Sequence, residues 1–347
     1  MRRLLFLFFC LLSLPVVSAA VKESSVYFIG NSYTFYNNLP TVVQAMAESR
    51  KIRLKVDASL QGAMDLRGFY TDPNHEKARR AATSGKYRWV VLQDQSQTPA
   101  NIPDRTKEYV QKWCALAAQG KSRPLLFITW PHAAKEGGKF TPMADMQQKT
   151  DTTYCEAAVA NKARVAPVSE AWRRWHKKYP ETTLYTSDGS HPNKLGTYLA
   201  ACVFYAVICE DSPIGLPSRL VIKKDGKKLL VLQVPSKHAE NCQKIAVDVV
   251  EQFTAQGYLD KKAARNSTLP DADTVRAKLR DGVTYKELRS LIGAPVYTRK
   301  ESGESFYQFT LRDNAEFCIY CTPAGKVLRA TIARPGSPCD IINVAEE

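Results

Sequence analysis

Residues 25–34 read SVYFIGNSYT, and this stretch decides the fold. The apolar run Ser25–Ile29 ends at Gly30, which predicts a short buried strand. Apolar residues at helical spacing follow at Leu39, Val42, Val43, Met46 and Ala47. A strand that leads directly into a helix opens a βαβ unit, so we expect the polar turn around Ser32 at the carboxyl end of a parallel strand.

The alternation of strand and helix patterns continues along the chain. Further strand patterns cover 52–60, 88–92, 125–130 and 164–168, and helix patterns cover 103–119, 141–161 and 194–209. Such alternation predicts an α/β fold in which helices cover both faces of a parallel sheet. A hairpin around Asp225-Gly226 and an amphipathic helix from Cys242 to Phe253 are expected to close this unit.

The chain has 347 residues, a length that favours two domains. We expect a signal peptide at 1–20, an α/β domain at 21–258 and a polar linker at 259–270. Residues 271–347 predict a small α+β domain, in which two short helices precede antiparallel strands.

The first residues have the three parts of a secretory signal. Arg2 and Arg3 are positive, Leu4–Leu14 is apolar, and Val17-Ser18-Ala19 offers a cleavage site. The apolar run is too short for a membrane span, and no later run approaches about 18 apolar residues. We therefore expect an exported protein without a transmembrane segment, periplasmic or extracellular, at a bacterial envelope.

The net charge is +15, and removal of Arg2 and Arg3 leaves +13. This excess favours anionic partners such as acidic glycans, lipopolysaccharide or anionic lipid, whereas nucleic acid is not expected outside the cytoplasm. The basic residues are spread along the chain with short clusters such as Lys223–Lys228, so an ordinary solvated surface is the alternative. An apolar fraction of 44% excludes intrinsic disorder as the main state.

Eight cysteines remain after the signal peptide, and an even number in an exported chain permits disulfides. They are Cys114, Cys155, Cys202, Cys209, Cys242, Cys318, Cys321 and Cys339. The sequence does not determine how these eight cysteines pair. For Cys318 and Cys321 we expect a structural disulfide, in which one of the two pairs with Cys339. The alternative is that several are buried as small apolar side chains.

Polar residues follow three of the strand patterns, where α/β proteins place their ligands: Ser32, Gly62 and Gln95. Asp188 and His191 lie near the end of the domain, just before the helix pattern at 194–209. A serine hydroxyl becomes a nucleophile when a base takes its proton, and His191 can do this. Asp188, three residues earlier, can accept from the other ring nitrogen and orient the ring. We expect the N–H groups of Ser32 and Gly62 and the Gln95 side chain to form an oxyanion hole.

In order and spacing, residues 24–258 resemble the SGNH (GDSL-like) hydrolase superfamily. The blocks are Gly30-Asn31-Ser32, then Gly62, then Gln93-Asp94-Gln95-Ser96, and an intact Asp188-x-x-His191. The resemblance implies a flavodoxin-like three-layer fold. It also implies that Ser32 hydrolyses esters through an acyl-enzyme.

Two positions depart from the family pattern. Asn31 replaces the usual aspartate, and Gln95 replaces an asparagine and is longer by one methylene. Gln93 is therefore a rival for the oxyanion contact. Each block residue also has a structural alternative, as a helix cap, a turn residue or a ligand of loop backbone: Ser32, Gly62, Gln95, Asp188 and His191.

Other kinds of site have weaker signals. The five histidines lie far apart without metal-ligand spacing, and the chain has no phosphate loop or dinucleotide fingerprint, so no metal or cofactor is expected. His132, after the fourth strand pattern, is a candidate for the cleft or for the surface. Four aromatic residues are candidates for a wall that binds a sugar or an acyl chain, or for core packing: Tyr33, Phe35, Tyr36 and Trp130.

The tail resembles the small lipoprotein domains of outer-membrane assembly and the β-lactamase-inhibitor-protein-like fold. The resemblance rests on Thr284–Leu288, on Leu291–Pro295 and on the strands around Gly325-Lys326-Val327. Within the first stretch, Thr284-x-x-Glu287 is a capping box. The resemblance implies a docking role at the bacterial envelope, with an envelope protein as partner.

The sequence thus predicts an exported serine esterase. An O-acetylated glycan is the preferred substrate, because the protein is expected to be exported and basic. The alternatives are a lipid or thioester acyl hydrolase, and a non-catalytic envelope binding protein that keeps the fold.

Overall fold

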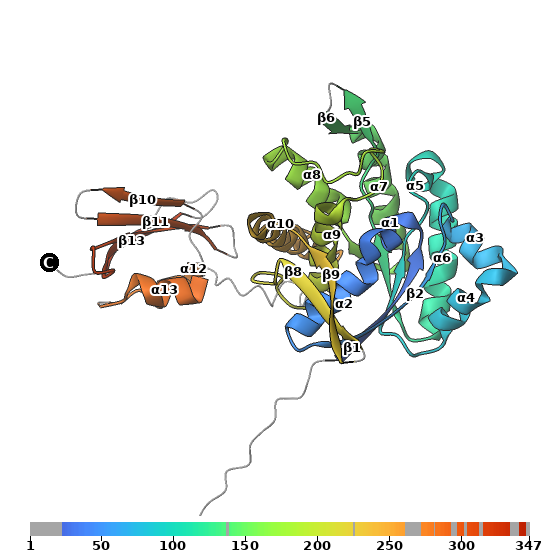
Figure 1. The fold of residues 1–347 in the computed structure, drawn as a ribbon, viewed down its shortest axis with the longest axis horizontal. Coiled ribbons are helices and arrows are strands. Elements are labelled where there is room, and N and C mark those ends of the chain that lie inside the picture. Colours follow the sequence, from blue (N-terminus) through green and yellow to red (C-terminus); the bar gives the residue numbers. More distant parts are fainter. Residues whose placement is uncertain are drawn as a thin grey trace, which may run out of the picture.

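A computed structural model describes residues 23–260 and 272–344, except for 137–138, 225, 281, 293–296, 302–303, 312–314 and 334–339. The expected signal peptide and residues 261–270 of the expected linker lie outside the described residues. The described residues form an α/β unit and a small unit with an antiparallel sheet of its own (Figure 1).

A five-stranded parallel sheet forms the centre of the α/β unit. Its strands lie in the order β2-β1-β3-β4-β7, which is the flavodoxin-like order. The strands are β1 (Glu23–Gly30), β2 (Arg53–Leu60), β3 (Trp89–Leu92), β4 (Arg123–Phe127) and β7 (Arg164–Ala166). Ligands of such sheets bind where the order reverses, between the carboxyl ends of β1 and β3.

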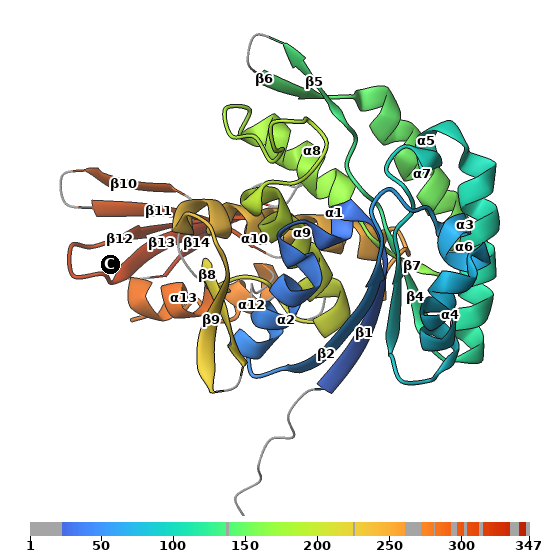
Figure 2. The ribbon, with the colours of Figure 1, turned by 45° about the vertical axis from the view of Figure 1, so that its right-hand side comes forward.

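Helices cover both faces of this sheet (Figures 1 and 2). Val26 and Phe28 of β1 face one core, with α2 (Leu39–Ser49), α8 (Val168–Lys178), α9 (Lys194–Cys209) and α10 (Ser236–Ala255). Tyr27 and Ile29 face the other core, with α3 (Leu66–Thr71), α4 (Glu76–Thr83), α6 (Pro103–Gln119) and α7 (Ala144–Asn161). Alternate residues of one strand thus serve opposite cores, and the predicted three-layer α/β fold is confirmed.

The helix α9 is apolar around its whole circumference because it lies inside the larger core. Its residues from Leu195 to Cys209 are all buried. Among the described residues no helix has both the length and the apolarity that a bilayer span requires.

Residues 133–142 differ from the prediction. They form a hairpin of β5 (Ala133–Glu136) and β6 (Lys139–Pro142), and α7 begins at residue 144 and not at 141. In the sequence the dipeptide Gly137-Gly138 is typical of a hairpin turn. The prediction did not use this signal and assigned residues 141 and 142 to the helix. The second hairpin, β8 (Arg219–Lys224) and β9 (Lys227–Gln233), forms where it was predicted.

The α/β unit continues past the expected boundary at residue 258. Leu259 is buried in the larger core. Asp260 accepts hydrogen bonds from the Arg164 guanidinium at 2.6 and 2.9 Å and also pairs with Arg123. Two residues of the expected linker therefore belong to the packed unit.

Seven of the eight cysteines are described, and no disulfide joins any two of these seven. Cys202 and Cys242 are fully buried in the larger core, in keeping with the alternative that cysteines serve as small apolar side chains. Burial raises the pKa of both thiols. Cys339 lies outside the described residues, so a bridge to it stays a prediction.

The small unit contains α12 (Ala272–Arg276) and α13 (Tyr285–Ile292), followed by a five-stranded antiparallel sheet. The strands are β10 (Tyr297–Glu301), β11 (Glu304–Thr310), β12 (Glu316–Cys321), β13 (Val327–Ala333) and β14 (Asp340–Asn343). The predicted capping box is confirmed, since the Glu287 N–H donates to Thr284 Oγ1 at 3.3 Å and the Thr284 N–H donates to Glu287 Oε2 at 2.8 Å. The α+β class is confirmed, and the resemblance to envelope lipoprotein domains stays a prediction.

Candidate active site

The carboxyl end of β1 makes a close contact with the carboxyl end of β3. The backbone N–H of Asn31 donates to Gln93 Oε1 at 2.9 Å, and Gln93 directly follows β3. A Cβ at Gly30 would lie 2.6 Å from this same oxygen, so position 30 has no room for a side chain. The glycine of the Gly30-Asn31-Ser32 motif therefore has a steric cause.

The Asn31 side chain is buried and uses both of its polar ends. Its Oδ1 accepts from the Tyr33 N–H at 3.2 Å and from Gln93 Nε2 at 2.8 Å. Its Nδ2 donates to the carbonyl groups of Met64 at 2.9 Å and Asp94 at 3.3 Å. An aspartate has no N–H to donate to these carbonyl groups, which explains asparagine at this position.

Ser32 is the first residue of α1 (Ser32–Phe35), a short helix for which Asn31 supplies the N-cap. The capping role that the sequence left open for Ser32 thus belongs to its neighbour. The Ser32 Oγ lies 2.8 Å from His191 Nε2, although the two residues are 159 positions apart. The fold therefore brings together the serine and the histidine that the sequence predicted.

His191 lies in a tight loop that directly precedes α9. The Thr186 N–H donates to the His191 carbonyl at 2.8 Å, which closes the loop. At its tip Gly189 has a φ of +68°, a conformation that favours glycine. The Ala133 N–H at the start of β5 donates to the Gly189 carbonyl at 2.8 Å. The unpredicted hairpin β5–β6 therefore helps to hold the histidine loop.

Asp188 accepts four hydrogen bonds. Its Oδ2 lies 2.6 Å from His191 Nδ1, and its Oδ1 accepts from the N–H groups of Ser190 and His191, both at 2.9 Å, and from the Thr186 hydroxyl at 2.8 Å. Burial raises the pKa of Asp188, but the bonds from His191, Ser190 and Thr186 together lower it well below the ordinary value. The carboxylate is therefore ionised at neutral pH.

The three side chains form one continuous hydrogen-bonded chain. With Asp188 ionised, His191 Nδ1 carries the ring proton and Nε2 is the acceptor for the Ser32 hydroxyl. This arrangement can take the hydroxyl proton as the oxygen attacks a carbonyl carbon. Among the described residues no cluster of His, Cys, Asp or Glu could hold a metal ion.

Gln93 is fully occupied and cannot serve an oxyanion. Its Oε1 accepts from the Asn31 N–H and from Thr34 Oγ1 at 2.9 Å, and its Nε2 donates to Asn31 Oδ1 and to the Asp94 carbonyl. No N–H of this amide remains for a substrate. The rival role that the sequence left open for Gln93 is therefore excluded by its own partners.

Gln95 divides its amide between two directions. Its Oε1 accepts from the backbone N–H groups of Gln97 at 2.8 Å and Thr98 at 3.2 Å, at the start of α5 (Thr98–Asn101). This is the loop-backbone role that the sequence left as an alternative. Its Nε2 has a contact of 3.4 Å with Ser96 Oγ, which is long for a hydrogen bond. Gly62 lies exposed in the turn after β2.

Aromatic side chains support the site, and sequence reasoning found only part of this role. Tyr36 stacks on the His191 ring, with centroids 4.1 Å apart and planes 12° apart. The Tyr33 hydroxyl lies 2.8 Å from Ser190 Oγ, and Trp130 Nε1 donates to the Ser190 carbonyl at 2.9 Å. Tyr33 and Trp130 are buried and stacked on each other, so for them the core-packing alternative is confirmed.

Two of the expected aromatic residues reach the surface. Phe35, the last residue of α1, is 41% exposed, and Tyr36, the next residue, is half-buried. They are the members of the expected wall that a substrate can touch.

His132 was a candidate for the cleft or for the surface. It is half-buried next to the site, and its ring contacts the loop after β3. Its Nε2 is 3.1 Å from Ser96 Oγ and its Nδ1 is 3.3 Å from Gln97 Nε2. Burial lowers its pKa, and the charge on Asp188 opposes this shift. Ser96 and Gln97 directly follow Gln95 in the sequence. His132 therefore supports the loop that carries Gln95, the candidate donor to the oxyanion.

Comparisons with known proteins agree with the fold. No protein-family model matches the chain. The curated proteins likewise give no match. Among solved structures, a DUF4886 family protein from Bacteroides uniformis is 15% identical with a TM-score of 0.54, covering 66% of this chain and 95% of its own. A likeness at this identity shows the shared fold.

Two other structures match about half of the chain with lower TM-scores. One is a candidate SGNH hydrolase from Slackia heliotrinireducens, 24% identical over 53% of this chain and 98% of its own, with a TM-score of 0.43. The other is the acetyl xylan esterase AlAXEase, 15% identical over 53% of this chain and 99% of its own, with a TM-score of 0.44.

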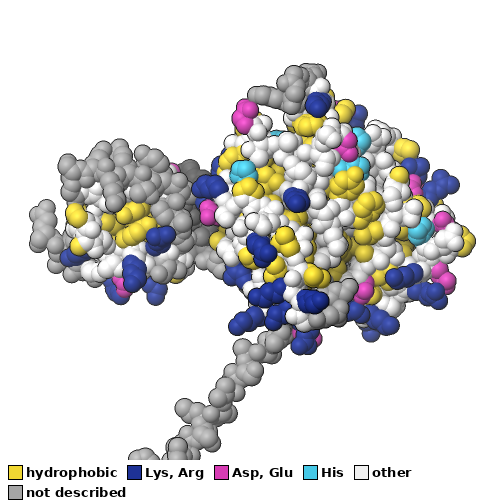
Figure 3. Space-filling view, viewed as in Figure 1, with side chains coloured by type: hydrophobic (Ala, Val, Ile, Leu, Met, Phe, Trp, Pro, Cys, Tyr) yellow, Lys and Arg dark blue, Asp and Glu magenta, His cyan; other side chains and the backbone are white. Residues whose placement is uncertain are grey.

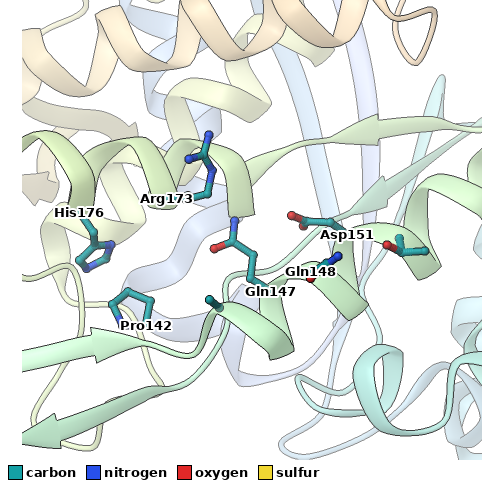
Figure 4. Close-up of a pocket in the computed structure, with 8 residues that line it drawn as sticks. Pro142, Gln147, Gln148, Asp151, Arg173 and His176 are labelled. Atoms are coloured by element: carbon teal, nitrogen blue, oxygen red, sulfur yellow. The ribbon is translucent and has the colours of Figure 1, made fainter.

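A separate cavity of about 360 Å³ lies between α7 and α8 (Figure 4). Gln147, Gln148 and Asp151 border it from α7, and Arg173 and His176 border it from α8. Burial raises the pKa of Asp151 to about 6, although hydrogen bonds from Ser169 and Gln147 oppose the shift. Asp151 is thus a titrating group away from the triad.

This raised pKa predicts a pH-dependent component of stability. In the unfolded chain an aspartate has a pKa of about 3.9, so the folded state binds more protons between about pH 4 and pH 6. The contribution of Asp151 to the free energy of unfolding therefore falls by about 3 kcal/mol as the pH rises through this window. Asp151→Asn keeps an acceptor for Ser169 and removes the titration.

Urea unfolding of wild type and Asp151→Asn at several pH values measures the effect. We expect the stability of the variant relative to wild type to rise from pH 4 to pH 7. Asp145→Asn, an exposed residue of the same helix, is the matched control and should show no such rise. A pH-independent difference for Asp151→Asn would contradict the raised pKa.

Proposed function

We propose that this protein is a serine hydrolase of carboxylic esters, with Ser32 as nucleophile, His191 as general base and acid, and Asp188 as the group that orients His191. The observation that carries the proposal is the continuous chain Ser32–His191–Asp188, with contacts of 2.8 and 2.6 Å. Three residues in the order nucleophile, base and orienting carboxylate are the arrangement that activates a serine. Their place at the sheet's switch point agrees with where such folds bind ligands.

The proposed reaction has two halves. Ser32 Oγ attacks the ester carbonyl while its proton moves to His191 Nε2, and a tetrahedral intermediate forms. The intermediate collapses as the C–O bond to the alcohol breaks, and His191 gives its proton to the leaving oxygen. Water then attacks the acyl-enzyme with His191 again as base, which releases the acid and restores Ser32.

The oxyanion of the intermediate needs donors near the nucleophile. We propose the backbone N–H groups of Ser32 and Gly62 and the Nε2 of Gln95 for this role. Ser32 begins α1, which follows β1. Gln95 follows β3 and Gly62 follows β2, the two strands that lie on either side of β1. We do not propose Gln93 as an oxyanion donor, because its amide already bonds to Asn31, Thr34 and Asp94.

An O-acetyl group of a glycan is the substrate that we propose. Aromatic rings offer a flat apolar face for a sugar ring. Phe35, three positions after Ser32, is 41% exposed, and Tyr36 stacks on His191. The net charge of +15 favours an anionic polymer.

We also propose that the protein acts outside the cytoplasm, at the envelope. The proposal rests on the charged, apolar and small-residue parts of residues 1–20. The small C-terminal unit has a core of its own and none of the triad residues. We propose that it docks the enzyme to an envelope protein.

The first prediction for this function concerns the nucleophile. Ser32→Ala should lower kcat/KM for p-nitrophenyl acetate by at least about a thousandfold, because no other hydroxyl contacts His191 Nε2 among the described contacts. Ser190→Ala is the matched control, since Ser190 is a neighbouring serine that contacts Tyr33 and not the histidine ring nitrogens. It should keep activity within about tenfold. Equal background rates for wild type and Ser32→Ala would instead support a non-catalytic binding protein.

The second prediction separates the two ends of the Gln95 amide. Gln95→Glu keeps an oxygen that can accept from Gln97 and Thr98 but removes the N–H donor. If Nε2 holds the oxyanion, kcat should fall about a hundredfold to a thousandfold, with little change in Tm. Steady-state kinetics and thermal unfolding measure the two quantities. Full activity in Gln95→Glu would show that Gln95 serves only the loop.

A further inference from the structure

The hairpin β8–β9 is a two-stranded sheet with one face against the protein and one face without cover. Leu220 and Leu232 are paired across the strands and are buried in the larger core with residues of α2 and α9. Figures 1 and 2 show the hairpin beside α2. The strands are therefore anchored at the end that lies away from the turn, and the opposite face remains available.

The uncovered face carries a mixed basic and apolar surface. Side chains alternate along a strand, so Arg219, Val221 and Lys223 share one face of β8. On β9 the partners of Val221 and Lys223 are Leu230 and Lys228, which therefore belong to the same face. Leu230 is 54% exposed, a large exposure for a leucine in a paired strand. We call these five residues the hairpin face.

The charges of the hairpin face repel one another. Lys223 and Lys228 are directly opposite across the strands, an arrangement in which like charges destabilise a sheet. Within the described part of the chain, no ion pair involves Arg219, Lys223 or Lys228, whereas many other basic residues pair with carboxylates. An anionic partner would remove this repulsion. Figure 3 shows Lys and Arg side chains gathered along the lower edge of the α/β unit, where Figure 1 places this hairpin.

We propose that the hairpin face binds the surface of an anionic lipid bilayer. Lysine and arginine attract acidic headgroups, and an exposed leucine beside them can enter the boundary between headgroups and acyl chains. A dissolved anionic polymer would use the three cations alone and would leave Leu230 and Val221 without a role. The combination of unpaired cations with the exposed Leu230 is what favours a bilayer.

Such binding would be peripheral and reversible. It uses one edge of the α/β unit and needs no helix that spans the bilayer. It is independent of the proposed hydrolysis, because none of the five residues contacts Ser32, Asp188 or His191 in the hydrogen bonds and ring contacts of the described site.

Co-sedimentation of the full chain with vesicles tests the proposal. Wild type should bind vesicles of phosphatidylcholine mixed with phosphatidylglycerol at low salt, and pure phosphatidylcholine vesicles much less. Lys223→Gln/Lys228→Gln should weaken the binding about thirtyfold, since each basic residue near an anionic surface contributes a factor of about five. Leu230→Ser should weaken it about tenfold through loss of apolar burial.

Lys77→Gln/Lys86→Gln is the matched control, because it removes the same charge from two exposed lysines in and after α4. It should change binding less than about threefold. Far-UV circular dichroism and thermal unfolding verify that each variant is folded. No binding of wild type to anionic vesicles overturns the proposal. Loss with the lysine pair but none with Leu230→Ser also overturns it, in favour of a soluble anionic polymer.

Discussion

The contact between the ends of β1 and β3 is the constraint on which the site depends. Gln93 and Asn31 exchange hydrogen bonds through their amides and the Asn31 N–H, in a place where both are buried. Buried amides of this kind are costly to leave unpaired, so the pair fixes the turn after β1 in one conformation. This turn fixes where α1 begins, and therefore also the position of the Ser32 hydroxyl.

The histidine half of the site is held by a different set of contacts. The loop around His191 is closed on itself by Thr186, attached to β5 through Gly189 and Ala133, and supported from below by Trp130. Trp130 stacks on Trp172 of α8, which places the loop on the core. The serine half of the site is thus fixed to the sheet and the histidine half to the core, and the two meet at the contact of 2.8 Å between Ser32 Oγ and His191 Nε2.

The sequence predicted those parts of the molecule that local pattern controls. The helices at 103–119 and 194–209 have the predicted bounds, because their apolar spacing and flanking residues are unambiguous. The hairpin at 133–142 was missed because its two strands are short and lack a clear alternation. Strand β10 contains mostly polar residues, so no apolar pattern in the sequence indicates it.

The structure brings Ser32, Asp188 and His191 into one hydrogen-bonded chain, but no local pattern in the sequence predicts the surroundings of these residues. The pairing of Asn31 with Gln93 joins residues 62 positions apart, and no local pattern announces it. The direction of the Gln95 amide depends on how the loop into α5 folds back, which spacing does not encode. The stacking of Tyr36 on His191 likewise joins two elements that only the fold brings together.

The central claim is that Ser32 is a reactive nucleophile because His191 and Asp188 activate it. Labelling of the full-length protein with a fluorophosphonate, followed by peptide mapping, tests this most directly. The account predicts one modified serine, on the peptide that contains Ser32, and loss of the label in His191→Ala. Labelling at another serine, or none in a folded wild-type protein, would contradict it.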